Sequence, residues 1–218
     1  MKDKLPILAI ETSDELCSVA VMIDETTFAE TSIKQKHVHS EKLIQLVEQT
    51  LKLAGIELKD IKTIAVSEGP GSFTGLRIGM AVAKGMALAQ GCFFIAVPTI
   101  DAIALQVSAT LSENSTFKIV NNINREEVYF AGYSVKNNEY HNGVPLKIVD
   151  KKDVDEELDE KDVVFGSYRP IKNNYKTAAP DARFVAMWAY KFGEKLVTRE
   201  YDYIEPNYLK KFVVRGKS

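Results

Sequence analysis

The sequence has few of the residues from which metal centres and disulfide frameworks are built. Its 218 residues include only two cysteines, three histidines and one tryptophan. Cys17 and Cys92 lie far apart, each in an apolar run where cysteine behaves as a small hydrophobic residue, so we expect no disulfide. The histidines, His37, His39 and His141, form no H-E-x-x-H pattern, which excludes that zinc-protease motif. We therefore expect no bound metal.

Excess charge and long apolar runs are also lacking. The chain has 28 basic and 30 acidic residues, a formal net charge of -2, so it lacks the positive field that attracts a phosphate backbone. No segment approaches the roughly 18 apolar residues of a membrane span, and the apolar run before Glu11 is too short for a signal-peptide core. We expect a cytoplasmic protein without a membrane segment, and any RNA contact would be local or supplied by a partner.

The first hundred residues contain three strand-like runs and then an alternation of helices and strands. Short polar breaks separate the three runs, which predicts an antiparallel meander. The later alternation predicts parallel strands joined by right-handed crossovers. Ser40 is the expected N-cap of the first helix, and Gly55 follows its end. The predicted strands are 7–13, 17–24, 26–34, 63–68 and 92–97, and the predicted helices are 39–54 and 76–90.

The second half repeats this order more faintly. The order of strands followed by helices occurs twice along the chain. This predicts an α/β protein of two similar lobes, each a mixed sheet flanked by helices, with a cleft between them. We expect an N-terminal lobe at 1–107 and a smaller C-terminal lobe at 108–218. The segments predicted in the second lobe are strands at 117–121, 127–135, 145–149 and 163–167, an acidic surface segment at 153–162, and a helix at 181–196.

A glycine-rich turn joins the predicted strand 63–68 to the helix after it. Gly69, Gly71 and Gly75, with Pro70, form a tight turn whose backbone amides lie at a helix N-terminus. The spacing matches neither the Walker pattern nor G-x-G-x-x-G. A phosphate site and a purely structural turn are both consistent with it.

The helix at 76–90 is apolar around most of its circumference. Its polar wedge contains only Arg77 and Lys84, whereas a helix that packs on its own sheet alone normally has a broader polar face. Small residues recur every four positions, which permits close approach of another backbone. Two interpretations are open: a central helix of a tightly packed monomer, or a helix between its own sheet and another subunit. The small residues are Gly75, Gly79, Ala83 and Ala87.

Four segments resemble the bacterial TsaB family, also called YeaZ. They are IETS (10–13), HSEKL (39–43), SEGPGSFTGLRIGMAVAKGMA (67–87) and NREEVYFAGY (124–133). The family belongs to the sugar kinase, Hsp70 and actin superfamily, so the resemblance implies a two-lobed actin-like, or ribonuclease H-like, fold. It also implies pairing with the catalytic paralogue TsaD, with the ATPase TsaE in a larger complex. That complex transfers a threonylcarbamoyl group to adenosine in tRNA.

The resemblance further implies that this chain is not itself an enzyme. Thr99 and Ile103 stand where TsaD has the two histidines of its metal pair, and neither replaces an imidazole. The expected role is a non-catalytic subunit that binds and supports TsaD and reaches tRNA through the complex. A homodimer in the absence of TsaD is left open, as are direct tRNA contacts and the position of TsaE.

Two sets of candidate residues follow from these arguments. The first is the partner interface on the two N-terminal helices: Leu43, Leu46, Val47, Leu51, Leu76, Arg77, Gly79, Met80, Ala83, Lys84 and Ala87. The second would serve an alternative function, that of an actin-fold phosphotransferase or ATPase in which Glu11 holds Mg²⁺. We expect no cofactor, with weak nucleotide binding left open. The weak phosphate-site candidates are Glu11, Thr12, Ser13, Gly69, Gly71, Ser72, Thr74 and Gly75.

Overall fold

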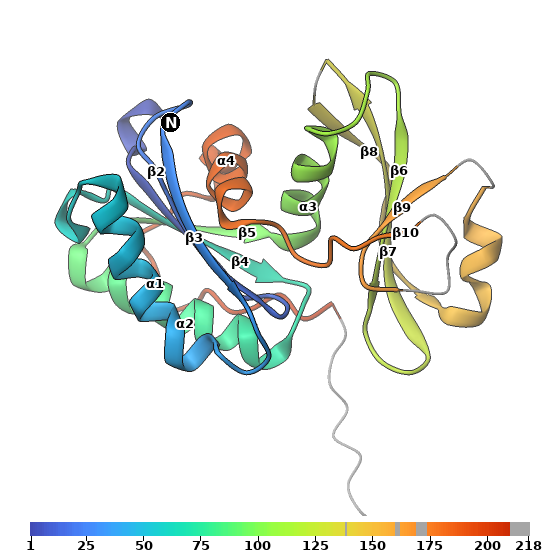
Figure 1. The fold of residues 1–218 in the computed structure, drawn as a ribbon, viewed down its shortest axis with the longest axis horizontal. Coiled ribbons are helices and arrows are strands. Elements are labelled where there is room, and N and C mark those ends of the chain that lie inside the picture. Colours follow the sequence, from blue (N-terminus) through green and yellow to red (C-terminus); the bar gives the residue numbers. More distant parts are fainter. Residues whose placement is uncertain (138, 160–161, 169–173, 210–218) are drawn as a thin grey trace, which may run out of the picture.

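The computed structural model describes residues 1–137, 139–159, 162–168 and 174–209. Within these ranges the chain forms two five-stranded mixed sheets, and helix α3 (Thr99–Ser108) stands between them (Figure 1). The prediction of a two-lobed α/β fold is confirmed.

The first sheet has the strand order β3-β2-β1-β4-β5. The first three strands form the predicted antiparallel meander, and β4 and β5 run parallel to β1. On the central strand, Ile7 pairs with Met22 on one side and with Thr63 on the other. Because β1 and β4 are parallel neighbours, both end at the same edge of the sheet. The strands are β1 (Ile7–Glu11), β2 (Leu16–Met22), β3 (Phe28–Lys34), β4 (Thr63–Gly69) and β5 (Phe93–Pro98).

Helices cover both faces of this sheet. Helices α1 (His39–Ala54) and α2 (Phe73–Gln90) pack on the face to which Leu8 points, while α3 and α4 (Ala182–Phe192) pack on the face to which Ile7 points (Figure 1). Successive strand residues point to opposite faces. A strand covered on both sides is therefore apolar throughout rather than alternating, and all five residues of β1 are buried.

The second sheet repeats the plan of the first. Its order, read from β8, is β8-β7-β6-β9-β10, with an antiparallel meander followed by two strands parallel to β6. The side of α3 that faces it contributes Ile103 and Ala104 to a core shared with Phe117 and Ile119. The faint repeat in the sequence thus corresponds to a repeated sheet topology. The strands are β6 (Thr116–Asn122), β7 (Glu127–Lys136), β8 (Glu139–Asp150), β9 (Val163–Phe165) and β10 (Asn174–Tyr175).

Buried polar contacts join the two lobes. The hydroxyl of Tyr133 on β7 donates to Oδ1 of Asp101 on α3 over 3.1 Å, and Nε1 of Trp188 on α4 donates to the hydroxyl of Tyr140 on β8 over 2.8 Å. The rings of Tyr133 and Tyr140 also meet edge to face, 5.6 Å apart. Helices α3 and α4, which pack on one face of the first sheet, are therefore also bonded to the second sheet.

The structure corrects the location of the predicted C-terminal helix. The sequence places the helix at 181–196 in the second lobe, but α4 ends at Phe192 and packs on β1 and β2 of the first sheet. Its buried residues Val185 and Ala189 share a core with Ile7. The physical reason is that this face of the first sheet is apolar and α3 alone does not cover it. The division at residues 107 and 108 stays a prediction, but this part of the range 108–218 lies on the first lobe.

The bounds of some elements and one helix cap also differ from the predicted ones. Helix α2 begins at Phe73, earlier than predicted, because the Ser72 side chain caps it. Helix α1 begins after Val38 and no side-chain cap is formed, so Ser40 lies inside the first turn. Strand β8 is more than twice as long as the predicted segment.

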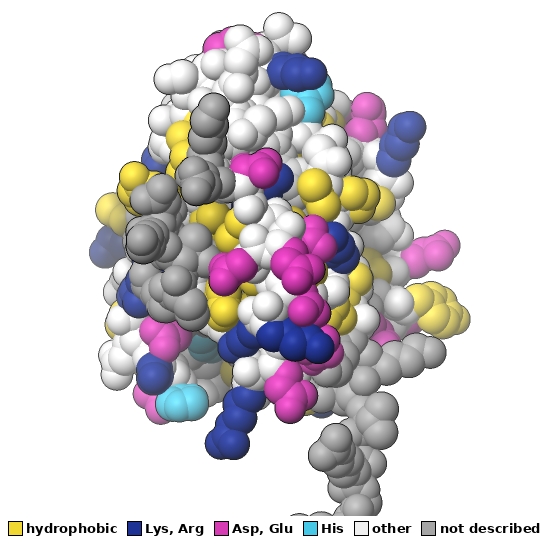
Figure 2. Space-filling view, turned by 90° about the vertical axis from the view of Figure 1, so that its right-hand side faces the viewer, with side chains coloured by type: hydrophobic (Ala, Val, Ile, Leu, Met, Phe, Trp, Pro, Cys, Tyr) yellow, Lys and Arg dark blue, Asp and Glu magenta, His cyan; other side chains and the backbone are white. Residues whose placement is uncertain are grey.

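Acidic and basic side chains lie close together on the outer face of the second lobe (Figure 2). Residues 153–157 of the predicted acidic segment lie in a short 3₁₀ helix, Lys151–Glu157, in which two lysines precede the acidic residues, while residues 160 and 161 of that segment lie outside the described ranges. Nζ of Lys147 lies 2.7 Å from Oε2 of Glu157. Opposite charges therefore partly cancel on this face.

Two further features were predicted from the sequence. Cys17 and Cys92 are buried free thiols. None of the helices in the described ranges is long and apolar enough to cross a membrane.

Candidate functional site

The ends of β1 and β4 and the start of α2 meet at one edge of the first sheet. The amide of Ser72 donates to the carbonyl of Ser13 over 2.6 Å, and the hydroxyl of Thr12 donates to the carbonyl of Gly75 over 2.8 Å. The segment after β1 thus lies directly against the first turn of α2. The structure brings together the predicted phosphate-site candidates Glu11, Thr12, Ser13, Gly69, Gly71, Ser72, Thr74 and Gly75.

Three glycines permit this close approach. A Cβ atom on Gly71 would lie 2.5 Å from the carbonyl oxygen of Ser13, and a Cβ atom on Gly75 or Gly79 would overlap Thr12. Real Cβ contacts are not that short, so any side chain at these positions would push the β1 segment away from α2. The glycine pattern is therefore explained by packing within the chain.

Glu11 ends β1 inside this packed region. It is fully buried, and its two carboxylate oxygens accept hydrogen bonds from the amide of Ser13 and from the hydroxyl of Ser67. Burial raises the pKa of Glu11 to about 7, because the charged carboxylate is favoured by water. Magnesium binding, the role given to Glu11 in the alternative function, stays a prediction and would have to compete with these two bonds.

A hollow of about 500 Å³ opens beside the loop, between the N-terminal ends of α1 and α2. Ser72 and Thr74 line it from α2, while Lys36, His37 and Asp14 line it from the neighbouring loops. Bonds within the chain already use the Ser72 amide, so the helix N-terminus offers fewer free amides to a phosphate than the sequence predicted. The absence of a cofactor stays a prediction, and weak nucleotide binding at this loop stays an untested alternative.

The two positions compared with the TsaD metal pair have structural contacts of their own. The hydroxyl of Thr99 accepts a hydrogen bond from the amide of Gly69 over 3.0 Å, and Ile103 is buried in the core between α3 and the second sheet. In the described ranges, no cluster of three or more His, Cys, Asp or Glu side chains is arranged to hold a metal ion. The expectation of a metal-free protein remains a prediction.

Most residues proposed for the partner interface lie inside the chain's own core. The line of Gly75, Gly79, Ala83 and Ala87 faces the first sheet, so the interpretation that it meets a partner helix is corrected. The physical reason is that these small residues admit the β1 segment rather than a second subunit. The interface as such stays a prediction. The larger side chains of the set that are buried are Leu43, Leu46, Val47, Leu51, Leu76 and Met80.

Helices α1 and α2 expose a different set of apolar side chains. Ile44 and Leu53 on α1 are 47% and 68% exposed, and Phe73 and Leu88 on α2 are 38% and 70% exposed. Gly85, also exposed, lies between the last two on α2. The sequence reasoning missed these residues, although the apolar character of α2 around most of its circumference was the available signal. These exposed apolar side chains are the candidates for a protein interface on the two helices.

After α4, the chain runs past the edge of β5 and then along α2. Thr198 pairs with Phe94 at the free edge of β5, and the amide of Asn207 donates to the carbonyl of Glu68 over 2.7 Å. The carbonyl oxygen of Asn207 lies 2.6 Å from the place that a Cβ of Gly69 would take. We call residues 198–209 the C-terminal strap, because they join β5, the glycine-rich turn and α2.

Two sheets of the same strand order, with a helix between them, define the chain as a two-lobed actin-like protein. A solved structure described as an uncharacterized protein with similarity to peptidase YEAZ, from Pseudomonas aeruginosa, superposes with a TM-score of 0.77 and 26% identity. The superposition covers 94% of this chain and 99% of that chain.

Sequence comparisons identify the family. The model of the family described as TsaD, tRNA N6-adenosine threonylcarbamoyltransferase, matches residues 26–142. The tRNA threonylcarbamoyladenosine biosynthesis protein TsaB of Escherichia coli (strain K12) is 33% identical over 150 residues, 68% of this chain and 63% of that protein. The protein of the same name from Bacillus subtilis (strain 168) is 30% identical over 158 residues, 72% of this chain and 68% of that protein. The chain therefore belongs to the TsaB (YeaZ) family, as its sequence motifs predicted.

Proposed function

We propose that this chain is a non-catalytic partner subunit of a tRNA-modifying complex. In the proposed complex it binds TsaD and supports the transfer of a threonylcarbamoyl group to adenosine in tRNA. The observation that carries the proposal is the exposed apolar surface on α1 and α2, in a chain whose relatives are named as threonylcarbamoyladenosine biosynthesis proteins. A cytoplasmic location follows from this role, because the proposed complex acts on tRNA.

The exposed apolar surface supports a helix-to-helix contact. Ile44 and Leu53 lie on α1, and Phe73 and Leu88 lie on α2, so the proposed partner would contact both helices. Burying such side chains contributes about 1.5–3 kcal/mol each when they are fully covered. TsaD is the proposed partner in a heterodimer, TsaE is proposed to join the larger complex, and a second copy of this chain is the alternative occupant when TsaD is absent.

The geometry of the glycine-rich turn supports the non-catalytic part of the proposal. The Glu11 carboxylate and the Ser72 amide, which an actin-fold phosphotransferase would use for Mg²⁺ and phosphate, are both bonded within the chain. Thr99, at one of the two positions compared with the TsaD metal pair, holds the amide of Gly69. These side chains support the packing of α2 on the sheet.

Reconstitution of tRNA modification, with each subunit omitted in turn, tests the proposal. We expect threonylcarbamoyladenosine to form only when this chain is present together with TsaD, TsaE and the threonylcarbamoyl-adenylate donor. Equal modification without this chain would refute the proposal. Stoichiometric ATP turnover by this chain alone with Mg²⁺ would instead favour the phosphotransferase alternative.

A further inference from the structure

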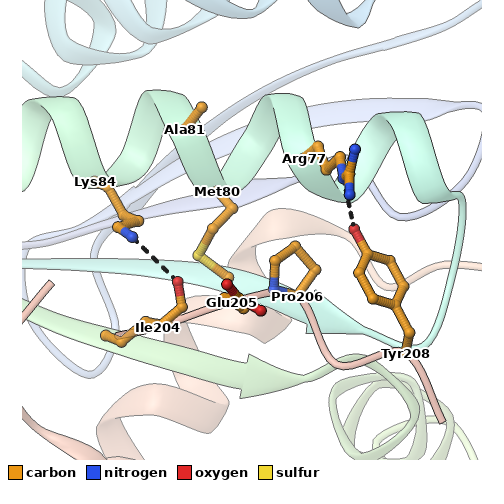
Figure 3. Close-up of a pocket in the computed structure, with 8 residues that line it drawn as sticks. All are labelled: Arg77, Met80, Ala81, Lys84, Ile204, Glu205, Pro206 and Tyr208. Atoms are coloured by element: carbon orange, nitrogen blue, oxygen red, sulfur yellow. Dashed lines mark hydrogen bonds between the residues drawn. The ribbon is translucent and has the colours of Figure 1, made fainter. Parts of the chain in front are cut away.

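A groove of about 270 Å³ lies between α2 and the C-terminal strap (Figure 3). Met80 from α2 and Ile204 and Pro206 from the strap give it apolar walls, and Arg77 and Lys84 stand toward its two ends. Arg77 and Lys84 are the two residues that form the narrow polar side of this otherwise apolar helix. The groove therefore combines an apolar interior with positive charge at both ends.

Among the described residues, the contacts of both cations are with neutral groups. Nε of Arg77 donates to the hydroxyl of Tyr208 over 3.1 Å, and its guanidinium lies 4.0 Å from the centre of the Phe73 ring. Nζ of Lys84 donates to the carbonyls of Asp202 and Ile204 over 3.3 and 3.1 Å. Within the described ranges neither forms an ion pair. The contacts of Arg77 leave its terminal amino groups as donors.

The N-terminal half of α2 adds to this positive potential. The first turn of α2 contains no acidic residue, so no side chain of that turn compensates the partial positive charge of the helix N-terminus. Glu205 lines the groove but forms no ion pair with Arg77 or Lys84 in the described structure. Within the part of the chain that the structure describes, the two cations of the groove are therefore not paired with a carboxylate.

A protein is a better match for this groove than a nucleic acid. Its interior is apolar, and Arg77 lies beside the exposed Phe73 of the proposed interface. A phosphate backbone is charged at every unit and would leave the apolar walls uncovered, whereas an acidic side chain flanked by apolar residues would meet both the cations and the walls.

We propose that the groove between α2 and the C-terminal strap binds an acidic side chain of the partner subunit, carried on an apolar segment. This proposal rests on the proposed function and extends the partner contact from the exposed face of α1 and α2 to the strap. Arg77 is well suited to bind a carboxylate because its guanidinium donates from a planar fork. Lys84 supplies a second positive charge at the other end of the groove.

The test compares Arg77→Gln/Lys84→Gln with the control Lys136→Gln/Lys152→Gln, in which two exposed lysines of the second lobe are changed. Both variants lose two positive charges and keep side-chain N–H donors. We expect the groove variant to bind purified TsaD roughly tenfold more weakly than wild type. We also expect its dissociation constant to depend less on salt, because a charged contact has been removed. The control should match wild type in both respects. A zero-length carbodiimide should couple Lys84, but not Lys152, to a carboxylate of TsaD.

Each other outcome contradicts the proposal. Equal affinity of the two variants would show that the groove is not part of the contact. Weaker binding with unchanged salt dependence would mean that the variant only loosens the strap. Loss of tRNA binding with TsaD binding intact would assign the cations to RNA phosphates. If the wild-type chain binds no TsaD at all, the proposed function itself fails and the groove proposal fails with it.

Discussion

Glu11 places a carboxyl group in the interior, where its charge is unfavourable. Burial raises the pKa of Glu11 from 4.5 in a model peptide to about 7 in the folded chain, and the nearby charge of Asp14 adds to this. A group whose pKa is raised on folding binds its proton more tightly in the native state. Its contribution to stability is therefore fully present below about pH 4.5 and is lost as the pH rises through about 7.

We expect Glu11→Gln to reduce this pH dependence. Glutamine has the same shape, accepts from the Ser13 amide and can donate to Ser67, but it carries no charge. Between pH 5 and pH 8 the wild-type free energy of unfolding should fall by on the order of 2 kcal/mol more than that of the variant. Urea unfolding at both pH values measures the difference. Parallel pH profiles would show that Glu11 is not protonated in the folded protein near neutral pH.

Gly79 and Gly85 provide a matched pair on the same helix. A methyl group on Gly79 would overlap the hydroxyl of Thr12, while one on Gly85 would meet nothing within 4 Å. We expect Gly79→Ala to lower the free energy of unfolding by about 1–3 kcal/mol through overpacking. Gly85→Ala should raise it by up to about 1 kcal/mol, because alanine favours the helix. Thermal melting distinguishes the two, and equal effects would place the small-residue line outside the core.

At the scale of elements, α1 and α2 have one face in the core and one face exposed. We expect Leu53→Asn and Leu88→Asn to change the free energy of unfolding by no more than about 0.5 kcal/mol, as is usual for surface positions. Together they should weaken TsaD binding by at least tenfold, because apolar area is lost from the contact. Leu196→Asn is the control, since Leu196 is also exposed but follows α4. Calorimetric titration measures the affinities for TsaD. Equal affinity of the double variant and the control would show that the interface does not include Leu53 and Leu88.

The elements that could be predicted from the sequence are those with a clear hydrophobic periodicity or with a residue that marks where the element ends. Helix α1 alternates buried and exposed residues at helical spacing, and Gly55 ends it with a φ of 69°. Helix α2 was found, but apolar residues around most of its circumference do not indicate which side meets the sheet. The orientation of Gly79 therefore needed the structure. Local pattern also does not show that α4 returns to the first sheet.

The candidate site was predictable only in part. The residues around the glycine-rich turn were named from the sequence, because glycines between a strand and a helix mark a close approach. Their bonds to Thr12 and Ser13 were not predictable, since those residues lie more than fifty positions earlier in the chain. The strap has no periodic pattern, and its contact with Arg77 and Lys84 is long-range.

At the scale of the whole molecule, the two lobes share helices and buried polar bonds. Asp101 on α3 accepts from Tyr133, and Trp188 on α4 donates to Tyr140. We expect both lobes to unfold in one cooperative transition, because neither keeps a complete core without these helices. Fluorescence of Trp188, the single tryptophan, should give the same midpoint as far-ultraviolet circular dichroism and a single calorimetric peak. Two separate peaks would show that the lobes are independent.

The return of α4 to the first sheet matters while the protein is being made. Ile7, Ala9 and Ile95 share their core with Val185 and Ala189, which leave the ribosome last among these residues. A nascent chain that ends before residue 182 has therefore made the strands of the first sheet but not the helix that helps to cover one face. That apolar face stays partly open during synthesis of the second lobe, so we expect the growing chain to be most prone to aggregation before α4 is made.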